Sequence, residues 1–457
     1  MKLSVYVLGR DVAVLEPAGD FRSVLSYRPE VPANDFVSLL MPVRTESYTW
    51  DDVLPPIFQM NLPEGYLLQI LQEQLGPTVT GSPMALLAVV GRNMVGRIQV
   101  AAPGADLKGN LKPIELGPLL QGDNSEEAFA DLVRQHAASG VSGVVPKFLD
   151  AQQEQHHKAT LLTRRHIIKG STGRLSYVSL NEHLCMQVVA RILPAARTEI
   201  SSDGKALVVH RFDVNAEGMP YRGMEDFCAL LGLRPANKYD TTWERIAKSV
   251  RAHVPGNRQY ATFNQLSRLL LLTYALRNSD CHAKNVSLLY TSRADVQLSP
   301  AYDMITTTVY EGYQNNPPGI SFAGRKTWIP GKTLATFISG TFGIAAKEQV
   351  KIVEEISDAV SEIAPRVREA MAHHTKFEEI GTRMLETWNE GVIGLRDRRV
   401  YSLTTWKKGK AFAGLKQLPR LEPARRVVGR SEGLARRHPK RKMKKATKNT
   451  VSTRRKI

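Results

Sequence analysis

Apolar and polar residues alternate along much of the first hundred positions, which is the pattern of β-strands. Residues 3–7 and 94–101 alternate in this way, and residues 36–41 form a third candidate strand. Residues 84–90 are either a hairpin partner of 94–101 or a helix. The stretch Asn61-Leu62-Pro63-Glu64-Gly65 contains turn-forming residues, and we expect it to have a structural role.

Further along the chain, the spacing of apolar residues changes to that of amphipathic helices. Residues 125–136 and 179–192 have this spacing, and the strand-like stretches 166–169 and 206–212 flank the second of them. Residues 263–277 are apolar nearly all round, and a helix without a polar face is buried. We therefore expect this helix to form the core of a helical lobe.

Together these patterns predict an α+β fold. A β-rich N-terminal subdomain precedes a two-lobed body whose C-terminal lobe is largely helical and starts with a short helix at 224–231. A basic tail, expected to be disordered, ends the chain. The predicted boundaries are 1–118 for the N-terminal subdomain, 119–415 for the body (first lobe about 137–222, helical lobe about 223–415) and 416–457 for the tail.

The composition indicates a globular protein with a strongly basic end. The chain has 457 residues, enough for two or three domains, and its three cysteines are too few and too widely spaced for a disulfide framework or a zinc site. No apolar run reaches the ~18 residues of a membrane helix, so we expect a cytoplasmic protein without a membrane partner. Fourteen Lys and Arg residues but a single acid lie between Arg425 and Ile457, and they account for most of the net charge of +18. This tail either binds nucleic acid without sequence preference or only aids solubility.

The stretch Asn278-Ser279-Asp280-Cys281-His282-Ala283-Lys284-Asn285 follows directly on the apolar helix. It places Asp280 and Asn285 five residues apart, which is the spacing of a kinase catalytic loop. There an Asp accepts the proton of the substrate hydroxyl and an Asn binds a metal ion at the nucleotide phosphates. The spacing alone is common in polar loops, so further residues must support this interpretation.

Asp303 and Lys169 supply that support. Asp303 follows a predicted hairpin at 286–300, where a kinase has its main magnesium-binding Asp. Lys169 ends a short β-branched strand, from which its amine can reach the α- and β-phosphates. Lys169, Asp280, Asn285 and Asp303 therefore occur in the chain order of a kinase-like, ATP-dependent phosphotransferase.

Three other features are candidates for the nucleotide site. Residues 209–212 lie where the chain would pass the base, and Glu182 is either the partner of Lys169 or the acid of a capping box that begins at Ser179. A loop of small residues upstream of the Lys169 strand is able to present backbone N–H groups to phosphates. That loop contains Ser142, Gly143, Val144, Val145, Pro146 and Lys147.

This ordered series of motifs resembles the HipA-like serine/threonine kinases, the toxin components of bacterial toxin–antitoxin pairs. The stretch from Asn278 to Asn285 is similar to the family signature Gly-Asn-x-Asp-x-His-x-Lys-Asn. The resemblance covers residues 1–390 and includes the stretches 61–65, 143–147, 166–169, 181–186, 211–213, 225–228, 238–239 and 300–304. This sequence departs from the family at Gly140, where some members have an autophosphorylated serine.

The resemblance implies a role for each of these residues. Asp280 is expected to be the catalytic base, and Asn285 and Asp303 to bind Mg²⁺. The residues expected to bind ATP are Ser142, Gly143, Val144, Val145, Pro146, Lys147, Lys169, His210, Arg211, Phe212, His282, Lys284, Asn285, Tyr302 and Asp303. The expected partners are a protein substrate with a Ser or Thr acceptor, such as an aminoacyl-tRNA synthetase, and a small HipB-like helix-turn-helix antitoxin.

Two other classes of function stay open at this point. One is a catalytically weak nucleotide-binding protein that regulates through an antitoxin-like DNA-binding partner. The other is a kinase for a small molecule. Lys169, Asp280, Asn285 and Asp303 are all present, which argues against the first class, and the identity of the acceptor decides between the second class and a protein kinase.

Overall fold

The computed structural model describes most of the first 401 residues. The described ranges are 1–19, 21–63, 68, 81–107, 114–138, 147–148, 157–158, 160–171, 173, 175–329, 331–397 and 399–401. All of them belong to one compact unit, Met1–Gly414. The predicted phosphate-loop residues Ser142 to Pro146 and the tail from Arg425 to Ile457 lie outside the described residues.

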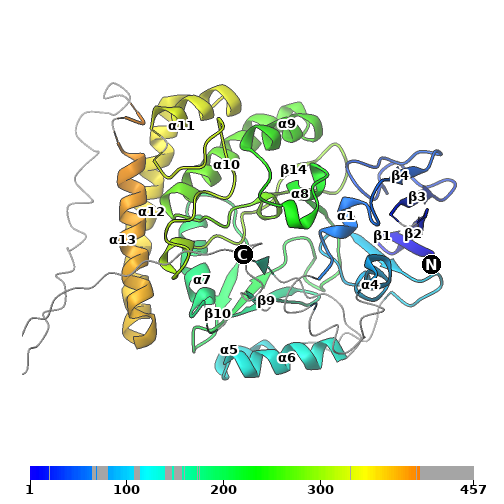
Figure 1. The fold of residues 1–457 in the computed structure, drawn as a ribbon, viewed down its shortest axis with the longest axis horizontal. Coiled ribbons are helices and arrows are strands. Elements are labelled where there is room, and N and C mark those ends of the chain that lie inside the picture. Colours follow the sequence, from blue (N-terminus) through cyan, green and yellow to red (C-terminus); the bar gives the residue numbers. More distant parts are fainter. Residues whose placement is uncertain are drawn as a thin grey trace, which may run out of the picture. The chain divides into compact units, whose positions relative to one another are not determined.

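The N-terminal part is a five-stranded antiparallel sheet with the strand order β4-β3-β2-β1-β5 (Figure 1). Its strands are β1 (Leu3–Val7), β2 (Arg10–Pro17), β3 (Ser23–Tyr27), β4 (Tyr48–Trp50) and β5 (Ile98–Ala101). The predicted strand at 3–7 is confirmed as β1, whereas only the second half of the predicted strand at 94–101 is a strand, β5. Residues 84–90 are helical, within α4 (Pro83–Val90), because Ser82 caps this helix by accepting a hydrogen bond from Ala85 N at 3.3 Å. A second short helix, α1 (Pro56–Gln59), precedes it.

The prediction of a strand at 36–41 was wrong. Ser38 and Met41 form only an isolated bridge across a tight turn, in which Met41 N donates to Ser38 O at 2.9 Å. The polar groups of this turn bind Glu225 instead: Ser38 Oγ and Leu39 N donate to its carboxylate at 2.6 and 2.7 Å. Four of the five apolar side chains of the segment are buried all the same, and burial alone does not distinguish a turn from a strand.

The first lobe of the body contains a four-stranded antiparallel sheet with the order β10-β11-β9-β8. Its strands are β8 (Thr160–Leu162), β9 (His166–Gly170), β10 (Thr198–Ile200) and β11 (Ala206–His210), and a separate short pair consists of β6 (Lys147–Phe148) and β7 (His157–Lys158). The helices of this lobe are α5 (Leu116–Gln121), α6 (Glu126–Ala138) and α7 (Val178–Val189). Phe129 of α6 packs against the sheet at Gly170, where a Cβ would lie 2.6 Å from the Phe129 ring.

The second lobe is built around α10 (Gly256–Ala275), which packs against α12 (Ala346–His373) and α13 (Glu378–Leu395) (Figure 1). The leucines of α10 are buried, which confirms the predicted core helix. The remaining elements include α8 (Phe227–Leu230), α9 (Trp243–His253), α11 (Lys332–Phe337) and a three-stranded sheet of β12 (Gly223–Asp226), β13 (Ser287–Tyr290) and β14 (Gln297–Leu298). The helix predicted at 224–231 is therefore wrong in its first half, because residues 223–226 pair with β13.

These elements form the predicted α+β fold, a β-rich N-terminal part followed by a sheet-containing lobe and a largely helical lobe. Within the described part of the chain, none of the helices combines the length and apolarity that a membrane crossing requires.

Glu225 of β12 connects the N-terminal part to the body through a buried carboxylate. Besides the two donors from the 36–41 turn, Tyr290 OH donates to this carboxylate at 2.6 Å. Burial raises the pKa of Glu225 above its ordinary value. Arg97 lies close by and donates to Phe36 O at 2.9 Å and to Thr291 O at 2.7 Å. Buried hydrogen bonds between these segments thus hold the two parts together.

We expect Glu225→Ala to lower the free energy of unfolding by about 3 kcal/mol, because three buried donors lose their acceptor. Thermal or denaturant unfolding would measure this loss. Glu217→Ala, which removes an exposed glutamate from a nearby loop, is the control and should be nearly neutral. Equal stability of the two variants would contradict the importance of this junction.

Candidate active site

The predicted catalytic loop begins where α10 ends. Arg277 has a left-handed backbone conformation, with φ at 53°, which ends the helix. Asn278 Oδ1 then accepts a hydrogen bond from Asp280 N at 3.0 Å, and Ser279 N donates to Thr307 Oγ1 at 2.7 Å. These bonds, together with the buried helix before them, hold the loop in a defined conformation.

Asp280 and Asn285 lie next to each other, as their spacing predicts. A 3₁₀ turn, η2 (Ala283–Asn285), bends the chain so that Asn285 Nδ2 donates to the backbone O of Asp280 at 3.0 Å. The same nitrogen donates to Asp303 Oδ2 at 2.9 Å. The carboxylate of Asp280 accepts a hydrogen bond from Tyr239 OH. One amide group therefore links the loop of the candidate base to the candidate metal ligand.

Lys169 is held by two carboxylates on different elements. From β9 its Nζ donates to Asp303 Oδ1 at 2.5 Å and forms an ion pair with Glu182 of α7. All three side chains are buried. Burial by itself would lower the pKa of Lys169, but the two carboxylates outweigh it and raise this pKa above its ordinary value. Lys169 is therefore a fixed positive charge at the edge of the site.

The structure also decides between the two roles considered for Glu182. The helix begins at Val178, and its N-cap is Tyr177, whose backbone is left-handed with φ at 55°. Ser179 is thus inside the helix, and its hydroxyl donates to Lys169 O at 3.2 Å instead of capping. Glu182 is the partner of Lys169 and not the acid of a capping box.

Asp303 itself has an unusual backbone conformation, with φ at 60°. Only glycine, and less often Asn or Asp, adopts this region readily, and such residues are concentrated at functional sites. The conformation places one oxygen of Asp303 on Lys169 and the other on Asn285. The sheet lobe and the helical lobe therefore meet at this carboxylate.

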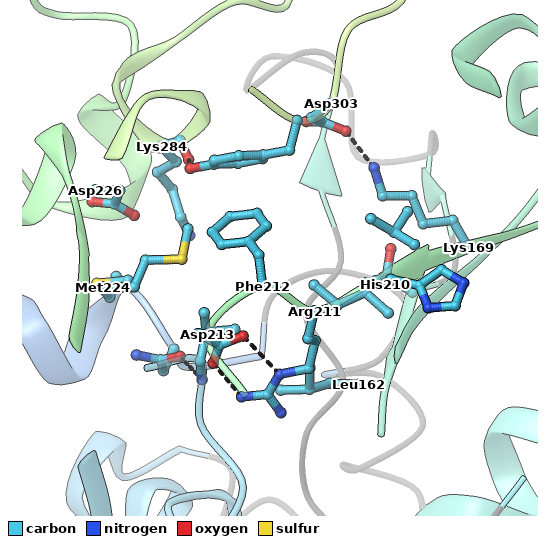
Figure 2. Close-up of a pocket in the computed structure, with 17 residues that line it drawn as sticks. Leu162, Lys169, His210, Arg211, Phe212, Asp213, Met224, Asp226, Lys284 and Asp303 are labelled. Atoms are coloured by element: carbon cyan, nitrogen blue, oxygen red, sulfur yellow. Dashed lines mark hydrogen bonds and ion pairs between the residues drawn. The ribbon is translucent and has the colours of Figure 1, made fainter. Parts of the chain in front are cut away.

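A cavity of roughly 890 Å³, its opening included, lies beside these groups (Figure 2). Its lining is largely apolar with a few polar and charged side chains, as is usual for small-molecule sites. The rings of Phe212 and Tyr302 lie 6.0 Å apart between their centroids, at 40° to each other. The lining residues are Met60, Asn61, Val95, Thr160, Leu162, Ile167, Lys169, Val209, His210, Arg211, Phe212, Asp213, Met224, Asp226, Lys284, Tyr302 and Asp303.

Seven of the predicted ATP-binding residues line this cavity: Lys169, His210, Arg211, Phe212, Lys284, Tyr302 and Asp303. Within the described part of the chain, Asp280, His282 and Asn285 are not among the residues that line the cavity. Two of them lie close to each other, with His282 Nε2 3.7 Å from Asp280 Oδ1. Lys147 lies in β6, and its backbone pairs with Lys158 of β7. The structure thus brings seven of the predicted residues, from both lobes, together around one cavity.

The side chain of Arg211 has a structural role. Its guanidinium forms a buried ion pair with Asp213 at 2.5 Å and donates to Met94 O and Thr163 O. Its backbone N–H donates to Arg165 O at 2.9 Å. The guanidinium therefore fixes the strand end that carries Phe212, and Phe212 directs its ring into the cavity (Figure 2).

Several cavity residues were not predicted from the sequence. Met60, Asn61 and Val95 come from the N-terminal part, where the sequence indicated only a structural turn around Asn61 and a strand at 94–101. Asn61 does stabilise the local backbone, since its Oδ1 accepts a hydrogen bond from Val95 N at 2.9 Å, but it also borders the cavity. Met224 and Asp226 were missed because their stretch was assigned to a helix. The family resemblance at residues 61–65 was the sequence signal that could have indicated the cavity residues of the N-terminal part.

The donor set of the site fits a magnesium ion. No cluster of three or more His, Cys, Asp or Glu side chains able to hold a metal occurs among the described residues. Mg²⁺ does not need one, because it usually binds one or two protein oxygen ligands and completes its shell with phosphate oxygens and water. The Asp303 carboxylate and the side-chain oxygen of Asn285 are ligands of this kind, and the hydrogen bond of 2.9 Å from Asn285 Nδ2 to Asp303 Oδ2 keeps the two side chains side by side.

Comparisons with known proteins agree with this architecture. The HipA N-terminal domain family matches residues 3–101, and the HipA-like C-terminal domain family matches residues 139–366. The kinase-designated Y4dM of Sinorhizobium fredii is 25% identical over 67% of this chain and 78% of its own length, and Y4mE of the same organism is 27% identical over 60% and 69%.

Among solved structures, the complex of the Shewanella oneidensis toxin HipA with HipB and operator DNA contains a chain with the same fold. That chain is 16% identical, with a TM-score of 0.60, and the match covers 86% of this chain and 97% of the other. The two domain matches lie in the same order as the two parts of the fold, and together they span most of the described residues. The chain therefore belongs to the HipA-like family.

Proposed function

We propose that this protein is an ATP- and Mg²⁺-dependent serine/threonine protein kinase of the HipA toxin type. The observation that supports this proposal most strongly is the chain of contacts from Glu182 through Lys169, Asp303 and Asn285 to the Asp280 loop. It connects a candidate phosphate-binding lysine, two candidate magnesium ligands and a candidate base, and Lys169 and Asp303 of this series line the largely apolar cavity.

In the proposed reaction the γ-phosphoryl group passes from ATP to a Ser or Thr hydroxyl. Asp280 orients the acceptor hydroxyl and accepts its proton. Lys169, held by Glu182 and Asp303, contacts the phosphates, and the apolar side of the cavity with Phe212 and Tyr302 receives the base. Mg²⁺ bound by Asp303 and Asn285 would offset negative charge on the phosphates.

Transfer of labelled γ-phosphate from Mg-ATP tests the proposed function. Purified protein is incubated with a cytosolic protein extract, and also alone, with EDTA in place of Mg²⁺ as the control. Labelled protein bands that require Mg²⁺ would support a protein kinase, and those bands would identify the acceptor. Binding of Mg-ATP without labelled protein would contradict the protein-kinase proposal and favour a small-molecule acceptor or a regulatory nucleotide-binding protein.

We propose a cytosolic protein as the acceptor, with aminoacyl-tRNA synthetases as the first candidates, and growth arrest as the consequence. The structural neighbour forms a complex with HipB and operator DNA. By analogy, we propose a small HipB-like DNA-binding antitoxin as the partner of this chain. Co-purification of such a protein with the full chain, and relief of growth arrest on co-expression, would test this partner.

The basic tail leads to a separate prediction about nucleic acid. We expect the full chain to bind duplex DNA or RNA with an affinity that falls steeply with salt, because fourteen Lys and Arg residues between Arg425 and Ile457 would release counterions. A chain that ends at Pro423 should lose most of this affinity. Equal binding by the two chains across a salt titration would show that the tail does not contribute.

A further inference from the structure

Tyr239 lies beside the candidate catalytic base, in the loop between the 3₁₀ turn η1 (Pro235–Asn237) and helix α9. Its phenol OH donates a hydrogen bond to Asp280 Oδ1. The edge of its ring meets the ring of His282, with centroids 5.1 Å apart and planes at 82°. His282 Nε2 lies 3.7 Å from the same oxygen, Asp280 Oδ1. Two side chains therefore converge on one oxygen of the carboxylate.

The backbone around Tyr239 is attached to the catalytic loop and to the segment at 319–326. Ala283 N donates to Lys238 O at 3.0 Å, which links the Tyr239 loop to η2. On the other side, Lys326 Nζ donates to Tyr239 O at 3.3 Å, and Trp243 N donates to Ser321 O at 2.9 Å. These contacts hold the phenol in a fixed position relative to Asp280.

The 319–326 segment is itself packed on the catalytic loop. A Cβ at Gly319 would lie 2.3 Å from Cys281 O and 2.8 Å from Ser279 O, so only glycine fits at this contact. The segment therefore contacts the catalytic loop directly, at the backbone on both sides of Asp280. It is also connected to the Asp280 carboxylate through the hydrogen bonds of Lys326 and Tyr239.

A carboxylate that acts as a base needs a defined orientation, because its reactive oxygen must meet the acceptor hydroxyl within hydrogen-bond distance. The last torsion of an Asp side chain is broad, so backbone geometry alone does not define where the two oxygens point. A hydrogen bond from a phenol to one carboxylate oxygen fixes this torsion and thereby sets the direction of the other oxygen.

We propose that Tyr239 is a positioning residue for Asp280, a statement that rests on the proposed kinase function. Its phenol holds Oδ1 and thereby sets the direction in which the carboxylate meets the acceptor. Tyr239 is not itself the phosphate acceptor in this proposal, in which the acceptor is a Ser or Thr hydroxyl.

Tyr239→Phe tests the proposal, because it removes the hydroxyl and keeps the ring. We expect the kcat for phosphoryl transfer to fall roughly 10- to 100-fold, as expected for the loss of a hydrogen bond to a charged group, while the KM for Mg-ATP and the Tm stay unchanged. Tyr260→Phe is the matched control, since it removes an exposed phenol that donates to Glu348 at 2.9 Å, and it should keep wild-type kcat.

A spectroscopic measurement tests the contact independently of activity. The near-ultraviolet tyrosine band should differ between wild type and Asp280→Asn, and this difference should vanish in a Tyr239→Phe background. If wild type transfers no phosphate, the kinase proposal fails, but this spectrum still tests the contact between Tyr239 and Asp280.

Three results would overturn the inference: an unchanged kcat in Tyr239→Phe, the same spectral difference with and without Tyr239, or phosphate on Tyr239 of the active enzyme in peptide mass spectrometry. Unchanged kcat beside an active wild type would disprove the positioning role and leave the kinase function intact.

Discussion

Asp280→Ala should abolish phosphoryl transfer while most of the Mg-ATP affinity remains. A positioned general base contributes roughly 10²- to 10⁴-fold to a proton transfer, so the rate should fall by about three orders of magnitude. Binding should persist because Asp280 is not among the described residues that line the cavity, whereas Lys169 and Asp303 are. Initial rates with labelled ATP and calorimetric titration with Mg-ATP would measure the two effects separately.

The control for this change is Asp358→Ala, which removes an exposed carboxylate from α12. It should leave both transfer and binding at the wild-type level. If Asp280→Ala kept full transfer activity, the role of base assigned to Asp280 would be wrong. If it lost nucleotide binding as well, Asp280 would act mainly on the structure of the site.

Periodicity and spacing were sufficient to predict two elements of the site. The nearly all-round apolar surface of residues 263–277 predicted a buried helix, and α10 is that helix. The interval between Asp280 and Asn285 predicted their proximity, which the turn η2 produces. Both predictions rest on local signals, because the apolar spacing of one helix and the interval between two residues are contained in short stretches of sequence.

Features that depend on distant partners were not predictable in this way. Residues 36–41 have the apolar character of a strand, but they form a turn in which the backbone N–H of Leu39 donates to the carboxylate of Glu225. Glu225 is almost two hundred positions away in the sequence. The role of Glu182 stayed open for the same reason, since a glutamate is expected at this position both in a capping box and in an ion pair with Lys169. Only the packing of β9 against α7 distinguishes between them.

The cavity shows this limit most clearly. Met60 and Val95 are ordinary apolar residues in the sequence, and they face the cavity only because the N-terminal sheet is joined to the body by Glu225 and Arg97. Arg211 is the opposite case, because its place in the stretch that passes the base suggested a nucleotide contact. Its guanidinium is instead paired with Asp213 inside the protein.

Asp303→Asn should eliminate transfer and, unlike Asp280→Ala, also the Mg²⁺-dependent part of ATP binding. Asparagine is the suitable replacement, because it tolerates the left-handed backbone at this position and keeps the shape of the side chain while removing its charge. Lys169 retains its ion pair with Glu182, so the fold should survive. Charge stabilisation of a transferring phosphoryl group is worth several kcal/mol, and we expect a loss of transfer of roughly 10³-fold or more.

Titrations of ATP with and without Mg²⁺ would separate the metal from the nucleotide. Wild type should bind ATP more tightly with Mg²⁺ than with EDTA, and Asp303→Asn should show one affinity in both conditions. Asp295→Asn is the matched control, since the carboxylate of Asp295 accepts hydrogen bonds from groups of its own turn, such as Ser292 N at 2.7 Å, and Asp295 lies outside the cavity lining. If Asp303→Asn kept the Mg²⁺ dependence of wild type, the metal would have to be bound elsewhere. The contacts of Asp303 with Lys169 and Asn285 would then serve only to hold the two lobes together.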